Sequence, residues 1–209
     1  MTARRGLPLE AAAFVVGAAA FGLAAHRPGL WPVHWGGIAL ALAALCRGVA
    51  RHPRSRRLMG LTGFPAYRWA YAVPAAAFGA ALAVAYRLVR GQTPLPSEAT
   101  GLVALATVIG LSEELGYRGF VQGGLRPYGL WLACAAAAAG HAAYKVCLLA
   151  LPAGAVRADL VVLGALTLGV GFVFGLMREA WGSLLFPAVA HAAFDVVAYA
   201  DLARRPWWM

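Results

Sequence analysis

The sequence has 209 residues, of which 62% are hydrophobic and 12% are charged, and its mean hydropathy is +0.70. This composition lies far outside that of soluble domains and predicts an integral membrane protein. The formal net charge of +10 does not indicate nucleic-acid binding, because the basic residues are scattered at the ends of apolar stretches and form no stripe with interleaved aromatic residues.

Seven apolar stretches follow one another along the chain, each near the roughly 20 residues that a membrane-spanning helix needs. Their approximate limits are Leu7 to Ala25, Leu30 to Cys46, Trp69 to Val89, Glu98 to Val121, Tyr128 to Leu151, Leu160 to Met177, and Ser183 to Leu202. We therefore expect an all-α, polytopic transmembrane bundle with about seven spans. Because neither a linker nor an internal repeat divides the sequence, we expect a single integral-membrane domain over residues 1–209.

The first stretch follows Arg4 and Arg5 and has the length of a secretory signal peptide. Glu10 interrupts it, however, and no clean small-residue cleavage site precedes a polar domain, so we expect a retained helix. The segment 47–57 carries five arginines and is predicted to face the cytoplasm, which places the amino terminus on the same side. The following segment, Leu58 to Trp69, mixes aromatic residues with glycine and proline and is predicted to lie on the membrane surface.

Five polar residues lie within these apolar stretches: Glu113, Glu114, His141, His191 and Asp195. An ionised side chain near the centre of a spanning helix costs roughly 2.5–3.5 kcal/mol on insertion scales, so such residues usually line a protected polar site. The sequence therefore predicts an intramembrane active site. The three cysteines, Cys46, Cys134 and Cys147, lie in or beside apolar runs without metal-like spacing, and we interpret them as packing residues.

The fourth stretch contains the run Ser112-Glu113-Glu114-Leu115-Gly116-Tyr117-Arg118-Gly119. On a helix, Glu114 and Arg118 share a face and can pair, while Glu113 points about 100° away. Glu114 is then expected to stay ionised and brace the helix, whereas the less neutralised Glu113 suits general-base work. The alternative is that both glutamates merely cap the span at the cytoplasmic boundary.

The two histidines lie on separate stretches. His141 is in the middle of the fifth, where a lone histidine is more often an inter-helix hydrogen-bonding residue than a catalyst. His191 lies in the last stretch, with Asp195 four residues later on the same face, where Asp195 can accept from His191 and orient it. Two histidines and several carboxylates on different helices can converge in a bundle, so the combination favours catalysis.

These residues resemble the CPBP family of intramembrane proteases, also called the ABI or type II CAAX prenyl endopeptidase family. The resemblance covers 98–202, which we expect to be the catalytic core. Its motifs are a Glu-Glu pair followed by arginine and glycine (Glu113, Glu114, Arg118, Gly119), a histidine four residues after an aromatic residue (His141), and a histidine four residues before asparagine or aspartate (His191, Asp195). Ala137 stands where the aromatic residue of the second motif is usual.

The resemblance implies a glutamate-type peptidase. In that case Glu113, assisted by His141, activates a water molecule, and His191 with Asp195 holds the developing oxyanion, with Glu114 and Arg118 in support. No cofactor is expected, although Glu113, His141 and His191 are also a candidate zinc set, and members of the family have been described as metalloproteases. Lys145 and Tyr117 are candidates for substrate contact.

The implied partners are the lipid bilayer and a membrane-associated protein or peptide, and the implied location is a bacterial cytoplasmic membrane. Prenylated or otherwise lipidated proteins, carboxy-terminal sorting tails and small peptide precursors are all open as substrates. Two other classes of function stay open. Buried glutamate and histidine also mark ion pathways, which would suit a transporter or proton relay, and Ala137 keeps open a non-catalytic immunity or scaffold protein built on the protease fold.

Overall fold

The computed structural model describes residues 7–25, 27–51, 55–61, 70–150 and 157–201, and all regular structure within these ranges is helical. The helices are α1 (Leu7–Ala24), α2 (Trp31–Arg51), α3 (Ser55–Leu58), α4 (Ala72–Val89), α5 (Leu102–Glu114), α6 (Gln122–Leu125), α7 (Leu130–Leu149), α8 (Arg157–Trp181) and α9 (Leu185–Tyr199). A π-helical segment, Leu115–Val121, joins α5 to α6 without a break.

The predicted helical membrane bundle is confirmed. Within the described residues, four helices are long and apolar enough to cross a membrane, namely α2, α4, α7 and the Leu160–Trp181 part of α8. Two shorter apolar helices, Pro8–Ala24 and Leu185–Tyr199, and the α5 to α6 element complete the bundle. Side chains exposed on its outside are largely apolar, as in Val108, Val161 and Leu166, whereas several carboxylates and arginines are buried. This arrangement suits a molecule surrounded by lipid.

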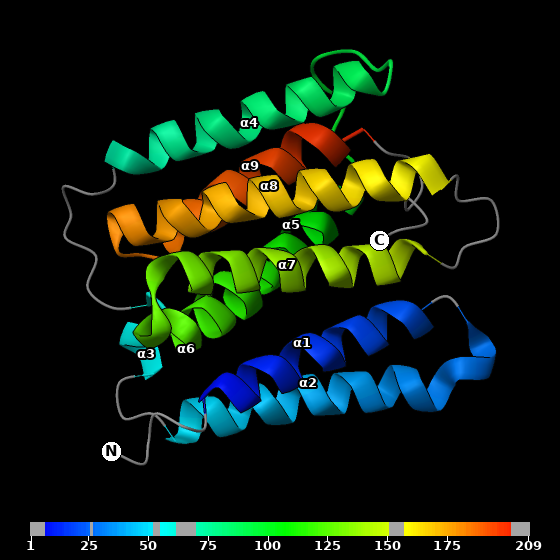
Figure 1. Cartoon of the computed structure of the whole chain (residues 1–209). Helices are drawn as coiled ribbons and strands as arrows, with labels where there is room; N and C mark the ends of the chain where they lie inside the picture. The colour runs from blue at the N-terminus through cyan, green and yellow to red at the C-terminus, as the bar shows by residue number, and fades with distance from the viewer. Residues whose placement is uncertain (1–6, 26, 52–54, 62–69, 151–156, 202–209) are drawn as a thin grey trace.

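Helix α7 is the central element of the bundle. Half of its spanning window is buried, against 17% for α2 and for α8. It packs between α1, which pairs with α2, and α8, while α4 and α5 both pack against α9 (Figure 1). Helix α5 runs behind α7 in the same view. The consequence is that α5, α7 and α9 meet in the interior of the molecule.

Small residues allow the closest of these contacts. A side chain at Gly79 on α4 would overlap the backbone of Ala190 on α9, the residue before His191. A side chain at Gly171 on α8 would meet both Ala138 on α7 and the guanidinium of Arg118. Since lipid supplies little hydrophobic driving force between helices, such backbone approaches carry much of the packing.

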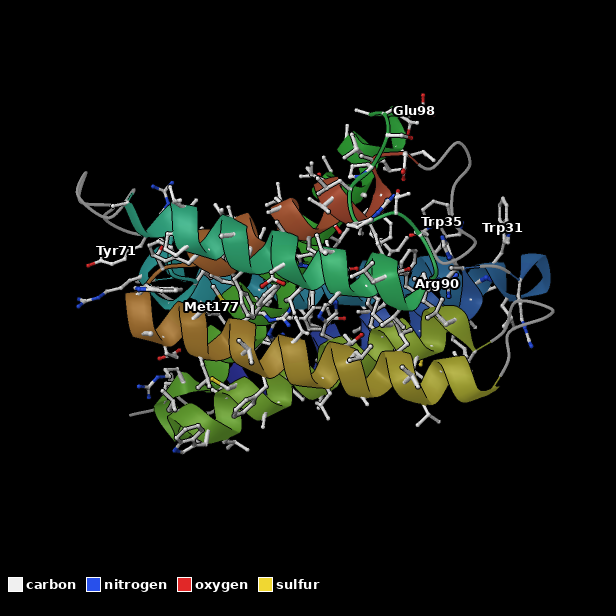
Figure 2. The ribbon with its side chains drawn as sticks, turned by 90° about the horizontal axis from the view of Figure 1, so that it is seen from above. Trp31, Trp35, Tyr71, Arg90, Glu98 and Met177 are labelled. Carbon is white, nitrogen blue, oxygen red and sulfur yellow. The ribbon has the colours of Figure 1, made fainter. Side chains whose placement is uncertain are left out.

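One end of the bundle, called the basic end below, contains ion pairs between α1 and α2. Here Arg47 and Arg51 of α2 bind the buried Glu10 of α1, with nitrogen–oxygen distances of 3.0 and 3.3 Å. Helix α2 ends five residues beyond the predicted limit at Cys46, and its arginines there pair with a carboxylate on the neighbouring helix. Trp31, Trp35, Arg90 and Glu98 lie toward the opposite end from Tyr71 (Figure 2).

The segment that follows α3 is fixed to the basic end of the bundle. The carbonyl oxygen of Leu58 accepts a hydrogen bond from Arg178 of α8, and that of Gly60 accepts one from the amide of Leu184. Met59, between them, is buried. The remainder of the segment predicted to lie on the membrane surface, 62–69, is outside the described residues, as are Arg4 and Arg5.

Helix α5 begins four residues later than the predicted limit at Glu98. The chain from 93 to 101 is bound instead to the end of α9, where Ala200 accepts from the amide of Thr100 at 2.6 Å and Asp201 accepts from that of Ser97 at 3.4 Å. Arg87 of α4 binds the same end of α9. Its Nη2 is 2.7 Å from Asp201 Oδ2, and its Nη1 donates to two carbonyl groups of α9 within 3.4 Å. Helices α4 and α9 are thus joined at this end.

Candidate active site

The polar residues predicted to form a site come together. Glu113 and Glu114 end α5, His141 lies in α7, and His191 and Asp195 lie in α9. All five side chains are buried or nearly so, and that of His191 is the most exposed at 14%. Three helices that are distant in sequence therefore supply one cluster of polar side chains in the interior of an apolar bundle.

Helix α7 holds the Glu113 carboxylate with two side chains. His141 Nε2 is 3.0 Å from Glu113 Oε2, and Lys145 Nζ forms an ion pair with Glu113 Oε1 at 2.6 Å. His141 and Lys145 are four residues apart and share one helix face, which explains how both reach the same group. His191 Nε2 lies 3.9 Å from Glu113 Oε2, on the side of α9. The expectation that Glu113 is less neutralised than Glu114 is wrong, because Lys145 supplies a cation to it.

Glu114 links two other side chains of the cluster, Arg118 and His191. Its Oε1 accepts from Arg118 at 2.9 Å, as the spacing predicts, and also from His191 Nδ1 at 2.8 Å. Asp195 was expected to orient His191, but its Oδ1 is 4.0 Å from His191 Nε2, too far for a hydrogen bond. Glu114 therefore orients the ring, which leaves His191 Nε2 directed toward Glu113 and Asp195.

The contacts of His141 determine its tautomer. Arg118 Nη1 lies 2.9 Å from His141 Nδ1, and a guanidinium nitrogen can only donate. His141 Nδ1 is then the acceptor, so the proton of the neutral ring is on Nε2 and is donated to Glu113. Arg118 consequently positions both Glu114 and His141.

The π-helical segment explains how Arg118 reaches two partners. Every residue from Gly116 to Val121 is buried, so this turn lies wholly within the bundle. Single π-helical turns are frequent at functional sites because they redirect side chains relative to a regular helix. No local pattern predicts this turn, although two glycines, Gly116 and Gly119, stand beside the charged residues.

Tyr117 and Lys145, the two candidates for substrate contact, differ in position. Tyr117 is 2% exposed and its ring stacks on that of His141, with centroids 4.8 Å apart. It forms part of the wall behind His141. The Lys145 side chain is 23% exposed, and its Nζ lies 5.5 Å from the centroid of the Tyr144 ring. Lys145 is the more accessible of the two.

Gly110 is a site residue that the sequence analysis did not include. It lies one turn before Glu113, and a Cβ there would collide with Asp195 Oδ2 and contact the His191 ring. That same carboxylate oxygen is buried and has no hydrogen-bond partner among the described residues. A glycine at position 110 therefore leaves room for α9 to bring its polar residues up to α5.

The donor set does not fit zinc in the form expected. Among the described residues, no three side chains of His, Cys, Asp and Glu converge as ligands of one metal ion. His141 faces Glu113 with a protonated nitrogen, since its Nδ1 is occupied by Arg118. Lys145 already supplies a positive charge to Glu113. A zinc ion bound by Glu113, His141 and His191 would have to displace these contacts.

Comparison with protein families agrees with this geometry. The family model described as type II CAAX prenyl endopeptidase Rce1-like matches residues 93–197, half of the chain. The chain belongs to this Rce1-like family. The matched region contains α5 to α8 and nearly all of α9, and with them every residue of the cluster just described. No curated protein and no solved structure is significantly similar to the chain.

Membership of the Rce1-like family establishes the general activity. The protein is a CAAX-type intramembrane endopeptidase, and its helices place it within the membrane. The predicted resemblance is thereby confirmed at the level of the family. The alanine at position 137, which departs from the family's second motif, is 1% exposed and packs inside the bundle one turn before His141.

Proposed function

We propose that this endopeptidase is of the glutamic type and that Glu113 is the general base that activates the attacking water. One observation supports this most directly: the Glu113 carboxylate is hydrogen-bonded to His141 and faces His191 Nε2 across 3.9 Å. A water molecule beside these two atoms can hydrogen-bond to both the carboxylate and the imidazole, which is the geometry that proton transfer needs.

The residues of the cluster divide the reaction between them. Glu113 accepts a proton from water as the water oxygen attacks the peptide carbonyl, and it then returns the proton to the leaving amine. His141, with its proton on Nε2, holds the Glu113 oxygen in place. Arg118 and Glu114 fix the two histidines through His141 Nδ1 and His191 Nδ1.

His191 is proposed to stabilise the oxyanion. Its Nδ1 is committed to Glu114, so a second proton on the ring resides on Nε2 and can be donated to the developing negative charge. Asp195, 4.0 Å from that atom, then stabilises the imidazolium without binding it directly. Arg118, Lys145 and this imidazolium supply three positive charges to a cluster that contains three carboxyl groups.

The proposed reaction needs no metal ion. Removal of metals from the purified protein with a chelator is expected to leave its cleavage rate unchanged. Loss of activity on chelation that added zinc restores would overturn this part of the proposal.

The proposed substrate is a membrane-associated protein or peptide, whether prenylated or carrying a carboxy-terminal sorting tail. We place the protein in a bacterial cytoplasmic membrane, with its amino terminus and its basic end on the cytoplasmic side. We also propose one domain over residues 1–209 with 98–202 as its catalytic core. The contacts of Phe14 on α1 with Tyr117, and of Arg87 on α4 with α9, support this.

The test is cleavage of a membrane-tethered reporter by Glu113→Gln in liposomes. A general base contributes about 10²- to 10⁴-fold, so this variant is expected to lose at least that much rate. Glu98→Gln is the matched control, because Glu98 is an exposed carboxylate at one end of the bundle (Figure 2). Cleavage by Glu113→Gln at the wild-type rate would exclude Glu113 as the base.

A further inference from the structure

The ion pair between Lys145 and Glu113 has no role in the reaction as described so far. Lys145 is the only lysine in the sequence, and it lies within the apolar helix α7, four residues before that helix ends, beside the proposed base. A lysine in this setting is costly to insert, since a buried cation loses its hydration. Its position at the site therefore calls for a function.

The other fixed cation of the cluster is already occupied. Arg118 Nη1 donates to Glu114 Oε1 at 2.9 Å and to His141 Nδ1 at 2.9 Å. Among the lysines and arginines of the described residues, Lys145 alone lies within 4.0 Å of Glu113. His141 donates as a neutral ring and so adds no full charge. Beside the proposed His191 imidazolium, 3.9 Å away, the ammonium group of Lys145 is the cation in direct contact with the Glu113 carboxylate.

A buried carboxylate without a cation readily takes up a proton, because burial disfavours the charged form. A protonated Glu113 cannot accept a proton from water, and the first step of the reaction would then stop. We propose that Lys145 is a positioning residue that keeps Glu113 ionised and therefore competent as the general base. The inference rests on the proposed function, since it assumes that Glu113 is the base.

Other charged and titratable groups also face Glu113 and remain in place when Lys145 is changed. From its own element and the π-helical turn these are Glu114, Arg118 and Tyr117; from α7, His141 and Tyr144; from α9, His191 and Asp195. Two of them are carboxyl groups that oppose a charge on Glu113. The loss of Lys145 therefore leaves an excess of acidic groups around the base.

The experiment compares the pH dependence of kcat/KM for wild type, Lys145→Met and Lys145→Arg. In Lys145→Met the acid limb of the profile is expected to move to higher pH, with a loss of about 10- to 100-fold at pH 6 that is largely recovered at alkaline pH. Lys145→Arg keeps the charge and should keep the wild-type profile. Arg126→Met, which removes a cation at the basic end of the bundle, should also keep it.

A purely structural role would lower the rate by the same factor at every pH, and that result would overturn the inference. An unchanged profile would overturn it as well. In either case Glu113 remains the base if Glu113→Gln is inactive at every pH, whereas an active Glu113→Gln would refute the proposed function itself.

Infrared spectroscopy provides a measurement that does not need activity. At neutral pH, Lys145→Gln should show a carboxylic-acid carbonyl band in addition to any in wild type, and the double variant with Glu113→Gln should lack this additional band. Absence of the band from folded Lys145→Gln would contradict the inference. This second variant replaces the ammonium by a neutral amide, so it also serves if Lys145→Met does not fold.

Discussion

Two ionic clusters, a part-buried one at the end of α9 and a buried one at its middle, differ in how completely their polar groups are paired. At the end, all three guanidinium nitrogens of Arg87 donate, to Thr93, Leu95, α9 carbonyl groups and both oxygens of Asp201. At the middle, Glu114 Oε2, Tyr117 Oη, Arg118 Nε and Asp195 Oδ2 have no hydrogen-bond partner among the described residues. The first cluster is saturated and the second is not.

This difference in pairing distinguishes a cluster that joins helices from one that suits a reaction site. Buried polar groups in proteins are nearly always hydrogen-bonded, and an unpaired one costs free energy that a saturated network does not. The Arg87 cluster therefore joins helices. The Glu113 cluster contains titratable groups and unpaired oxygen atoms, which suits a site that must receive water and a substrate carbonyl.

Glu114→Gln should give the largest effect, because Glu114 connects the cluster. The change leaves the guanidinium of Arg118, 1% exposed, without a counter-charge, and breaking such a buried pair costs about 3–5 kcal/mol of unfolding free energy. His191 loses its anionic acceptor too, so cleavage should fall to background even in folded protein. Denaturant unfolding in detergent and the reporter assay measure the two effects.

The matched change in the saturated cluster is Arg87→Met. It should also destabilise the protein, by about 2–3 kcal/mol, because hydrogen bonds to a charged group are lost. Its turnover per folded molecule should nevertheless stay near wild type. A loss of turnover in folded Arg87→Met as large as that in Glu114→Gln would show that the two clusters are not separate in function.

The sequence predicted more of the site's membership than of its connections. Apolar stretches fixed the helices, and the rarity of polar residues within them identified Glu113, His141 and His191 as a group. Which carboxylate holds which histidine depends on helix rotation and on the π-helical turn, and neither follows from local pattern. For that reason Glu114 could not be foreseen as the partner of His191.

Lys145 illustrates a signal that was present but incompletely used. Its spacing of four residues from His141 places both on one helix face, which implies that they reach one partner. The choice between Glu113 and Asp195 as that partner required the distance between helices. Gly110 was beyond reach for the same reason, because close approach between α5 and α9 has no signature in a sequence rich in glycine and alanine.

Gly110→Ala should impair the site without removing a polar group. Its Cβ would occupy the space of Asp195 Oδ2 and press on the His191 ring. Displacement of a catalytic group by about 1 Å can cost on the order of 100-fold, so we expect a loss of about 10- to 100-fold in kcat/KM. The reporter assay measures this loss.

Gly169→Ala on α8 is the matched control for that substitution. A Cβ there meets nothing within 4 Å, and the exposed helical position should gain about 0.5–1 kcal/mol of stability without change in activity. Wild-type activity of Gly110→Ala would mean that α9 can shift away from α5 without loss of activity. The tight packing at the site would then have no part in catalysis.

The smallest expected effect concerns Asp201 in the saturated cluster, and it depends on pH. Its hydrogen bond with Arg87 holds the pKa of Asp201 below its ordinary value in the folded protein. The stabilisation is therefore fully present above the unfolded pKa of about 4 and is lost as pH falls through the lower folded value. Because the Asp201 side chain is partly exposed, we expect about 1 kcal/mol or less. Melting temperatures of wild type and Asp201→Asn should differ at pH 7 and converge below pH 4, whereas a constant difference at all pH values would show that the charge of Asp201 contributes nothing.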